Sequence, residues 1–196
     1  MSRLRVRAVT TIVTLALSGT VTAPAFAQDP PPQSAESAQA GGAEFDTTAP
    51  AETPTVPGSV AQIVDGVAYA PAAAPDAVKQ VIWAGNDIVG LPYVYGGGHR
   101  DFDDDGYDCS GTISYALHGA GLLARPRDSS SFFRYGAAGR GSWVTIFTRS
   151  SHAYMTVAGI RLDTSAADDP GGLKGPRWRP LRGSDRGFKV RHPVGL

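Results

Sequence analysis

The chain has 196 residues, and its 18 basic and 18 acidic side chains give a formal net charge of zero. This balance argues against a general nucleic-acid binder, because such a protein needs a basic surface to neutralise phosphates. The sequence contains one cysteine, Cys109, so no internal disulfide can form within it.

The first 27 residues have the pattern of a secretory signal peptide. Three arginines stand near the start, residues 8–21 are mostly apolar, and Ala25-Phe26-Ala27 places small residues where a signal peptidase reads. The apolar run is shorter than the roughly 20 residues of a membrane-spanning helix. We therefore predict cleavage after Ala27, export to the cell envelope or beyond it, and no stable membrane insertion of the mature chain. Removal of the signal leaves 15 basic and 18 acidic residues, a net charge of −3.

Composition divides the remaining chain into a linker and a folded domain. Residues 28–75 are rich in Pro and Ala and hold few large apolar side chains, which predicts a disordered linker with an extended arm near residues 59–69. Residues 76–196 form a segment of about 120 residues, enough for one modest hydrophobic core. We expect this segment to be a single domain and the protein to be a monomer.

Two helices are expected in the first half of this domain. Asp76 is predicted to cap the first helix, whose apolar residues recur at helical spacing until Gly90. The second helix is predicted to begin at Cys109 and to end at Gly121, with its apolar residues on one face.

The second half of the domain is predicted to form short strands. β-branched and aromatic residues are frequent there, and Gly159 permits a tight reversal between two of the strands. The expected strands are residues 143–148, 152–158, 160–164 and 188–192. Helices followed by consecutive strands favour an α+β fold with an antiparallel sheet.

The residues around Cys109 suit a reactive thiol. Asp108 is placed to cap the helix, and Cys109 then lies in the first turn, where the helix dipole favours a negative sulfur. Ser110 and Gly111 are small, which leaves room for a substrate above the sulfur.

A general base and a residue that orients it are also available. His152 begins a predicted strand and could reach the sulfur if the sheet packs on the second helix. The reversal at Gly159 would bring Asp163 beside the ring, where a carboxylate fixes the tautomer and stabilises the imidazolium. His192, on the last predicted strand, is the alternative third member.

Several of these residues occur in blocks that resemble the NlpC/P60 cysteine peptidases. The blocks are Pro92-Tyr93-Val94-Tyr95-Gly96-Gly97, Asp108-Cys109-Ser110-Gly111, the apolar helix ending in Gly121-Leu122, and His152 at a strand start. The Asp-Cys-Ser-Gly block alone is moderately specific, and its combination with the other blocks is strong. The resemblance extends over about residues 76–164, most of the predicted domain.

The resemblance implies a papain-like fold with N-terminal helices packed on a small antiparallel sheet. It implies a secreted hydrolase that cleaves the stem peptides of bacterial peptidoglycan, commonly between D-glutamate and diaminopimelate. Cys109 matches the nucleophile, His152 the base and Tyr93 the tyrosine that helps to hold the oxyanion. Asp163 falls near the third polar position, which is usually His, Asn or Gln in the family. Ser110 is expected beside the substrate.

No cofactor or metal ion is expected. Residues 101–106 imitate the start of a calcium loop, but the twelfth position is Thr112 and not the required Glu. His99, which follows three glycines, could line the cleft, but its interpretation as part of a loop is preferred. The C-terminal tail is basic, which keeps an alternative function open: a catalytically weak protein that retains the fold and binds the cell wall.

Overall fold

The computed structural model describes residues 53–165, 175–181 and 184–196. These residues belong to one compact unit, Thr47–Leu196. The predicted signal peptide and residues 28–52 of the predicted linker lie outside the described residues. Within the described part of the chain, no helix is long and apolar enough to cross a membrane.

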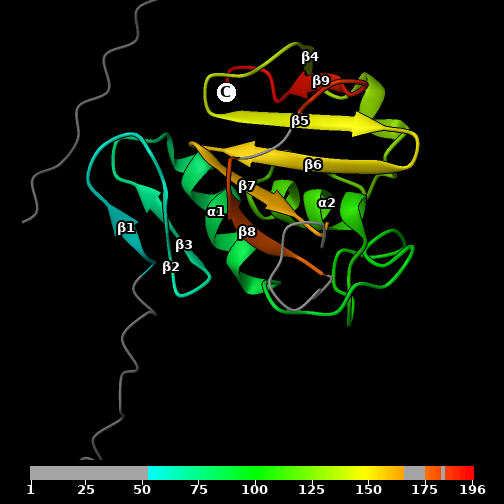
Figure 1. The fold of residues 1–196 in the computed structure, drawn as a ribbon, viewed down its shortest axis with the longest axis horizontal. Coiled ribbons are helices and arrows are strands. Elements are labelled where there is room, and N and C mark those ends of the chain that lie inside the picture. The colour runs from blue at the N-terminus through cyan, green and yellow to red at the C-terminus, as the bar shows by residue number, and fades with distance from the viewer. Residues whose placement is uncertain (1–52, 166–174, 182–183) are drawn as a thin grey trace, which may run out of the picture. The chain divides into compact units, whose positions relative to one another are not determined.

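Three short strands precede the first helix, where the sequence predicted a linker. They are β1 (Thr55–Val56), β2 (Gln62–Val64) and β3 (Val67–Pro71), and they form a small sheet in the order β1-β3-β2 (Figure 1). Ala68 and Ala70 of β3 are completely buried. The side-chain amide of Asn86 accepts from the Ala68 N–H and donates to the Ala68 C=O, both at 2.9 Å. Residues 62–64 and 67–69 fall within the predicted extended arm, whereas the ordered residues on either side of it were predicted as linker.

Helix α1 (Asp76–Asp87) packs against this small sheet and against α2 (Cys109–Gly119). Its apolar stripe, Val78, Val81 and Ile82, is completely buried. Pro75 occupies the capping position, and no side chain caps the helix. The predicted capping by Asp76 is therefore wrong: this residue lies in the first turn and pairs with Lys79 at 3.2 Å.

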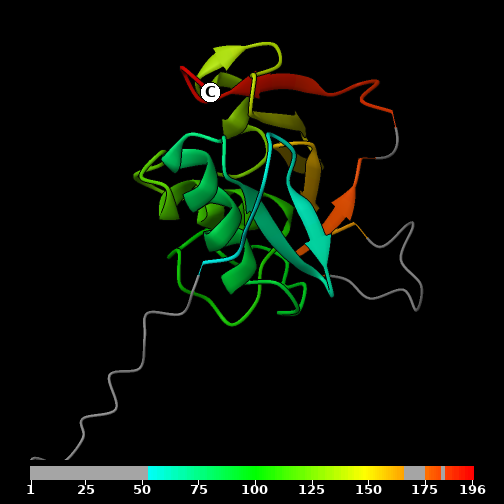
Figure 2. The same cartoon turned by 90° about the vertical axis from the view of Figure 1, so that its left-hand side faces the viewer.

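The larger sheet has six strands in the order β4-β9-β5-β6-β7-β8, and every neighbouring pair is antiparallel. Figure 2 shows the helices on one side of this sheet. This confirms the predicted α+β class with helices packed on an antiparallel sheet. The bounds are β4 (Ala137–Ala138), β5 (Val144–Arg149), β6 (His152–Val157), β7 (Ile160–Asp163), β8 (Arg177–Pro180) and β9 (Lys189–His192). The sequence did not predict β4, β8 or the 3-10 helix η1 (Ser131–Arg134), which are short and largely lack apolar alternation.

Apolar and polar or aromatic side chains alternate along β6, so that one face of the strand lies in the core and the other carries titratable groups. Ala153, Met155 and Val157 are completely buried in the core that the helices share with the sheet. Because successive strand residues point to opposite faces, His152 and Tyr154 lie on the other face.

The neighbouring strand β7 follows the same rule. Leu162 pairs with Met155 and lies in the core. Arg161 and Asp163, one position on either side of Leu162, therefore share the face of His152. The side of the sheet away from α2 thus carries an imidazole, a carboxylate and a guanidinium close together.

The start of α2 is fixed by a close approach of two glycines. A Cβ built on Gly111 would lie 2.0 Å from the carbonyl oxygen of Gly97, and the N–H of Asp108 donates to the same oxygen at 3.3 Å. No side chain fits at Gly111 without a shift of the backbone. This contact determines where the first turn of α2, and with it Cys109, lies relative to the preceding loop.

We predict that Gly111→Ala destabilises the protein. In an unconstrained helix this change would stabilise by about 1 kcal/mol, but the added methyl overlaps a backbone oxygen. We expect a net loss of about 1–3 kcal/mol in the free energy of unfolding, measured by urea denaturation. A midpoint equal to or above that of the wild type would contradict the packing described here.

Candidate active site

Cys109 is the first residue of α2, and Asp108 caps the helix as predicted. Oδ1 of Asp108 accepts from the N–H groups of Ser110 and Gly111 at 3.0 and 2.8 Å. The N–H groups of a first helical turn have no acceptor within the helix, so this end of α2 favours a negative group. The position of the sulfur at the N-terminus of α2 therefore favours its thiolate form.

The structure brings Cys109, His152 and Asp163 together. The imidazole of His152, the first residue of β6, lies close enough to the thiol for each group to shift the pKa of the other. Its Nε2 lies 3.3 Å from Oδ1 of Asp163, which leaves Nδ1 as the ring nitrogen for the sulfur. The Nε2 contact is an ion pair and lies outside the alignment of a regular hydrogen bond.

Asp163 is held by contacts on both of its oxygens. Its side chain has no solvent exposure. Oδ1 accepts from the N–H groups of Thr164 at 2.8 Å and Ser165 at 3.1 Å, and Oδ2 accepts from Nη2 of Arg161. These donors fix the carboxylate in the position from which it faces the ring of His152.

The three groups alter one another's pKa values. Burial alone would raise the pKa of Cys109, but hydrogen bonds from His152, Ser129 and the Ala153 N–H hold it below its usual value. Burial would lower the pKa of His152, but Asp163 and Cys109 raise it to about 9. The pKa of Asp163 is lowered because His152 and Arg161 outweigh its burial. The site therefore shifts the balance toward a thiolate, an imidazolium and a carboxylate, relative to the same three side chains in water.

Cys109 is largely buried, with 8% exposure, but it lines a cleft of about 430 Å³. The cleft is mostly surrounded by hydroxyl and carboxyl groups. Its lining comprises Tyr93, Tyr95, Gly96, His99, Asp108, Cys109, Ser110, Asp128, Ser129, Ser130, Ser150 and Ser151. A polar peptide segment with several hydrogen-bonding groups suits such a lining.

The two residues predicted beside the substrate, Tyr93 and Ser110, both line this cleft. Burial and the nearby Cys109 and Asp108 raise the pKa of Tyr93, so its hydroxyl remains a donor. The Ser110 hydroxyl donates to Oδ1 of Asp108 at 3.0 Å, which makes it a support for the helix cap as well as part of the cleft wall.

Two residues of the cleft were missed as site residues by the sequence interpretation. The hydroxyl of Ser129 lies 3.7 Å from the sulfur of Cys109, and nothing in its polar loop marked it. Nε2 of His99, interpreted as a loop residue, lies 3.0 Å from both Oδ1 of Asp108 and Oγ of Ser110. The three glycines before His99 were the available signal, since they allow the backbone to pass close to the helix start.

His192, the alternative third member, is not at the site. It pairs with Ala137 on β4, and its Nδ1 contacts the carbonyl oxygen of Gly139 at 3.0 Å. The reason is the strand order: β9 joins the sheet beside β5 and β4, so its last residue lies away from the strand end that begins with His152.

No family model matches the chain, and no curated protein matches it. Solved structures that resemble it include Rv1477, a hypothetical invasion protein of Mycobacterium tuberculosis, with 29% identity over 59% of this chain and 62% of that chain at a TM-score of 0.43. They also include the peptidoglycan hydrolase RipB (Rv1478) from Mycobacterium tuberculosis, with 24% identity over 62% of this chain and 66% of that chain at a TM-score of 0.47. The match thus covers less than two thirds of either solved chain.

The pKa shifts predict how Cys109 reacts with iodoacetamide. Below its pKa the sulfur is protonated and unreactive, so a lowered pKa moves the rise in alkylation rate to a pH below that of an ordinary cysteine. We expect His152→Ala to shift this rise to higher pH and to slow alkylation near neutrality about tenfold. Since Cys109 is the only cysteine, the gain in mass reports it alone.

His192→Ala is the matched control and should leave the profile unchanged, because that ring contacts Gly139 and not the sulfur. Identical profiles for the wild type and His152→Ala would contradict the assigned contact between thiol and imidazole.

Proposed function

We propose that this chain is a cysteine hydrolase of the NlpC/P60 type that cleaves amide bonds in the stem peptides of bacterial peptidoglycan. The observation that carries the proposal is the contact of Cys109, His152 and Asp163 beside an open cleft. A thiol paired with an imidazole, itself oriented by a carboxylate, is suited to nucleophilic acyl transfer. The substrate class rests on the resemblance of the sequence motifs, which points to the bond between D-glutamate and diaminopimelate.

The first half of the proposed reaction forms a thioester. The Cys109 thiolate attacks the carbonyl carbon of the scissile amide, and the carbonyl electrons move to its oxygen. The oxyanion is held by the N–H of Cys109 and the hydroxyl of Tyr93. The C–N bond then breaks as His152 gives its proton to the leaving amine.

The second half releases the acid product. His152, now neutral, takes a proton from water as the water oxygen attacks the thioester carbon. Collapse of this second intermediate expels the thiolate and restores the imidazolium. Asp163 does not change its protonation; it orients the ring and stabilises the imidazolium in both halves.

The proposed setting is outside the cytoplasm. The N-terminal segment directs export, cleavage after Ala27 gives a mature chain that begins at Gln28, and the Pro/Ala-rich segment tethers a monomeric catalytic domain. This setting would place the domain where peptidoglycan is found.

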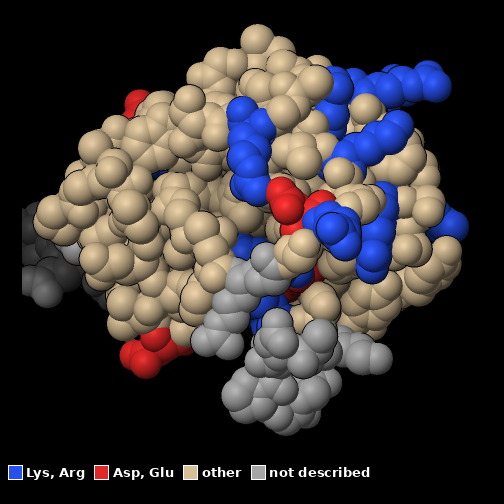
Figure 3. All heavy atoms as spheres, turned by 45° about the horizontal axis from the view of Figure 1, so that its top comes forward, with Lys and Arg blue, Asp and Glu red and all other residues tan. Residues whose placement is uncertain are grey.

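A second function, wall binding without efficient turnover, is favoured by the distribution of basic residues. Lys and Arg side chains gather around a few acidic groups on one face of the molecule (Figure 3). Among the described residues, β8 carries Arg177 and Arg179, opposite Asp163 and Arg161 on β7, and β9 carries Lys189 and Arg191. Such a surface suits the carboxylates or phosphates of wall polymers. Binding of this kind would need no reactive thiol.

Replacement of Cys109 separates the two functions. We expect Cys109→Ala to reduce the release of peptide fragments from purified peptidoglycan at least about a thousandfold, measured by mass spectrometry of the soluble products. Sedimentation with insoluble wall material should be unchanged, and a wild-type melting temperature would show that the variant is folded. Fragment release by Cys109→Ala at the wild-type rate would contradict the proposed mechanism.

Replacement of the Tyr93 hydroxyl tests the oxyanion assignment. We expect Tyr93→Phe to lower kcat about 10- to 100-fold, because a donor to the developing charge is lost, while alkylation of Cys109 stays at the wild-type rate. Tyr95→Phe is the matched control: Tyr95 lines the same cleft but is 90% exposed. Equal losses in both variants would count against a specific role for Tyr93.

A further inference from the structure

Arg161 occupies a position on β7 that connects the site to the outer face of the sheet. It pairs with Thr156 on β6 and with Arg179 on β8. Its side chain is only 15% exposed, which is low for an arginine. A cation at this depth needs compensation by nearby groups.

Two contacts fix the guanidinium of Arg161. Its Nη2 donates to Oδ2 of Asp163. Its Cζ lies 3.8 Å from the ring centroid of Tyr154, which itself stacks on Phe147 at 4.7 Å. The ring of Tyr154 restrains the plane of the guanidinium, and an N–H at the edge of the guanidinium donates to the carboxylate of Asp163.

The two oxygens of Asp163 have different partners as a result. Oδ1 faces Nε2 of His152 and accepts two backbone N–H groups, whereas Oδ2 accepts from Arg161. The donation to Oδ2 restrains rotation of the carboxylate and so keeps Oδ1 directed at the imidazole.

The guanidinium of Arg161 also compensates the charge of Asp163. A thiolate, an imidazolium and a buried carboxylate sum to one negative charge, and the guanidinium brings the sum to zero. Without it, an unbalanced buried carboxylate is driven to bind a proton, and a protonated Asp163 no longer stabilises the imidazolium that sustains the thiolate. The other cations nearby, Arg177 opposite Asp163 and Arg179 opposite Arg161, come from β8.

We propose that Arg161 is a positioning residue of the hydrolase site: its guanidinium holds the Asp163 carboxylate against His152 and balances its charge, and thereby maintains the reactive form of Cys109. This role rests on the proposed function, since it assigns a duty within the same site. Arg161 acts through Asp163 and does not touch the reacting atoms.

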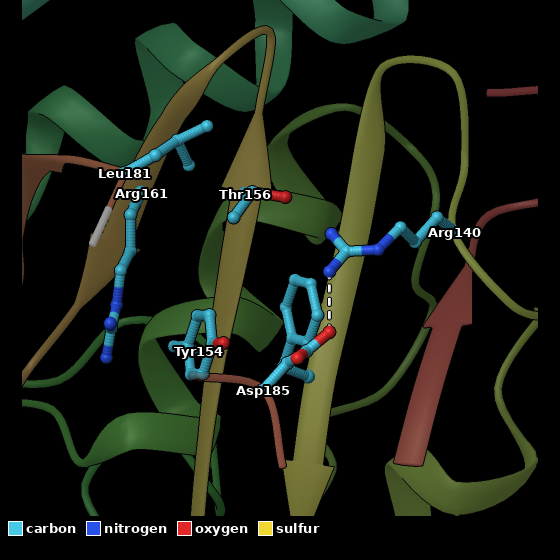
Figure 4. A pocket seen from close by; sticks show the side chains of 7 residues that line it. Arg140, Tyr154, Thr156, Arg161, Leu181 and Asp185 are labelled. Atoms are coloured by element: carbon cyan, nitrogen blue, oxygen red, sulfur yellow. Dashed lines mark hydrogen bonds and ion pairs between the residues drawn. The ribbon is translucent and has the colours of Figure 1, made fainter. Parts of the chain in front are cut away.

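A cavity of about 250 Å³ gives access to Arg161 from the outer face (Figure 4). The same cavity contains a second pair of the same kind: Arg140 lies over the ring of Phe147 at 4.9 Å and pairs with Asp185 at 2.5 Å. The hydrogen bond and ion pair of Arg140 are made to Asp185 and not to Asp163 or His152, so this second pair provides a control with matched chemistry.

The first test compares substitutions of the two arginines. We expect Arg161→Met, which keeps an apolar stem over Tyr154, to slow alkylation of Cys109 near neutrality about tenfold and to move the rise in rate to higher pH. Arg161→Lys, which keeps the charge, should restore the rate to within about threefold of the wild type, and Arg140→Met should match the wild type. If Arg161→Met does not fold, Arg161→Gln, which keeps a hydrogen-bond donor but no charge, replaces it in the comparison.

The second test uses chemical rescue. Arg161→Ala should be slow, and guanidinium ion at concentrations below those that unfold the protein should accelerate its alkylation, because the cavity admits the ion to Asp163. Guanidinium should not accelerate Arg140→Ala. A wild-type alkylation profile for the folded Met or Gln variant, or a slow Ala variant that guanidinium does not accelerate, would overturn the assignment.

These readouts are independent of peptidoglycan. If the wild type released no fragments but its thiol responded to Arg161 as expected, the proposed substrate would fail and the role of Arg161 would stand. If the wild type cleaved peptidoglycan and Arg161→Met reacted like it, the role of Arg161 would fail and the function would stand.

Discussion

The buried carboxylate of Asp163 is the group on which the arrangement of the site depends. Its side chain has no contact with solvent, so the protein itself must balance its charge and satisfy its oxygens. The end of β7 and the two residues after it supply the backbone donors, β6 supplies the imidazole, and β7 supplies the guanidinium. A shift of β7 by one residue along β6 would turn Asp163 into the core and remove its contact with His152.

The two faces of the sheet contribute separately to the site. The face toward the helices provides the hydrophobic core, and the opposite face carries His152, Arg161 and Asp163. The sulfur of Cys109 belongs to the helix layer. It can therefore meet the imidazole only at an end of the sheet, where a side chain from the opposite face reaches past the edge of the strand. His152 is the first residue of β6, and the N–H of Ala153 also donates to the sulfur. The close approach of Gly97 and Gly111 is what allows α2 to begin at this point.

Local patterns in the sequence predicted the parts of the site that depend on neighbouring residues. The cap by Asp108 follows from residue type and helical spacing, and the approach of Asp163 to His152 follows from the reversal at Gly159. Non-local placement was harder to predict. His192 was a reasonable third member until the strand order separated β9 from β6. The sheet before α1 was predicted only as an extended arm near residues 59–69, because alanines such as Ala68 and Ala70, though fully buried, are too small to mark a core strand in the sequence. Arg161 was missed because an arginine in a strand normally indicates a solvent-exposed position.

The aspartate at the third position of the site gives a physical reason for the proposed role of the arginine two residues earlier. In the family that the sequence resembles, this position is usually neutral, held by His, Asn or Gln, and such a residue can orient an imidazole without adding a charge. An aspartate stabilises the imidazolium more strongly, but it also brings a buried negative charge toward the thiolate. Because alternate residues of a strand share a face, Arg161 can reach Asp163 from within β7 itself. The pattern Arg-x-Asp on one strand therefore pairs the carboxylate that faces His152 with a compensating cation, and the stacking on Tyr154 holds that cation in place.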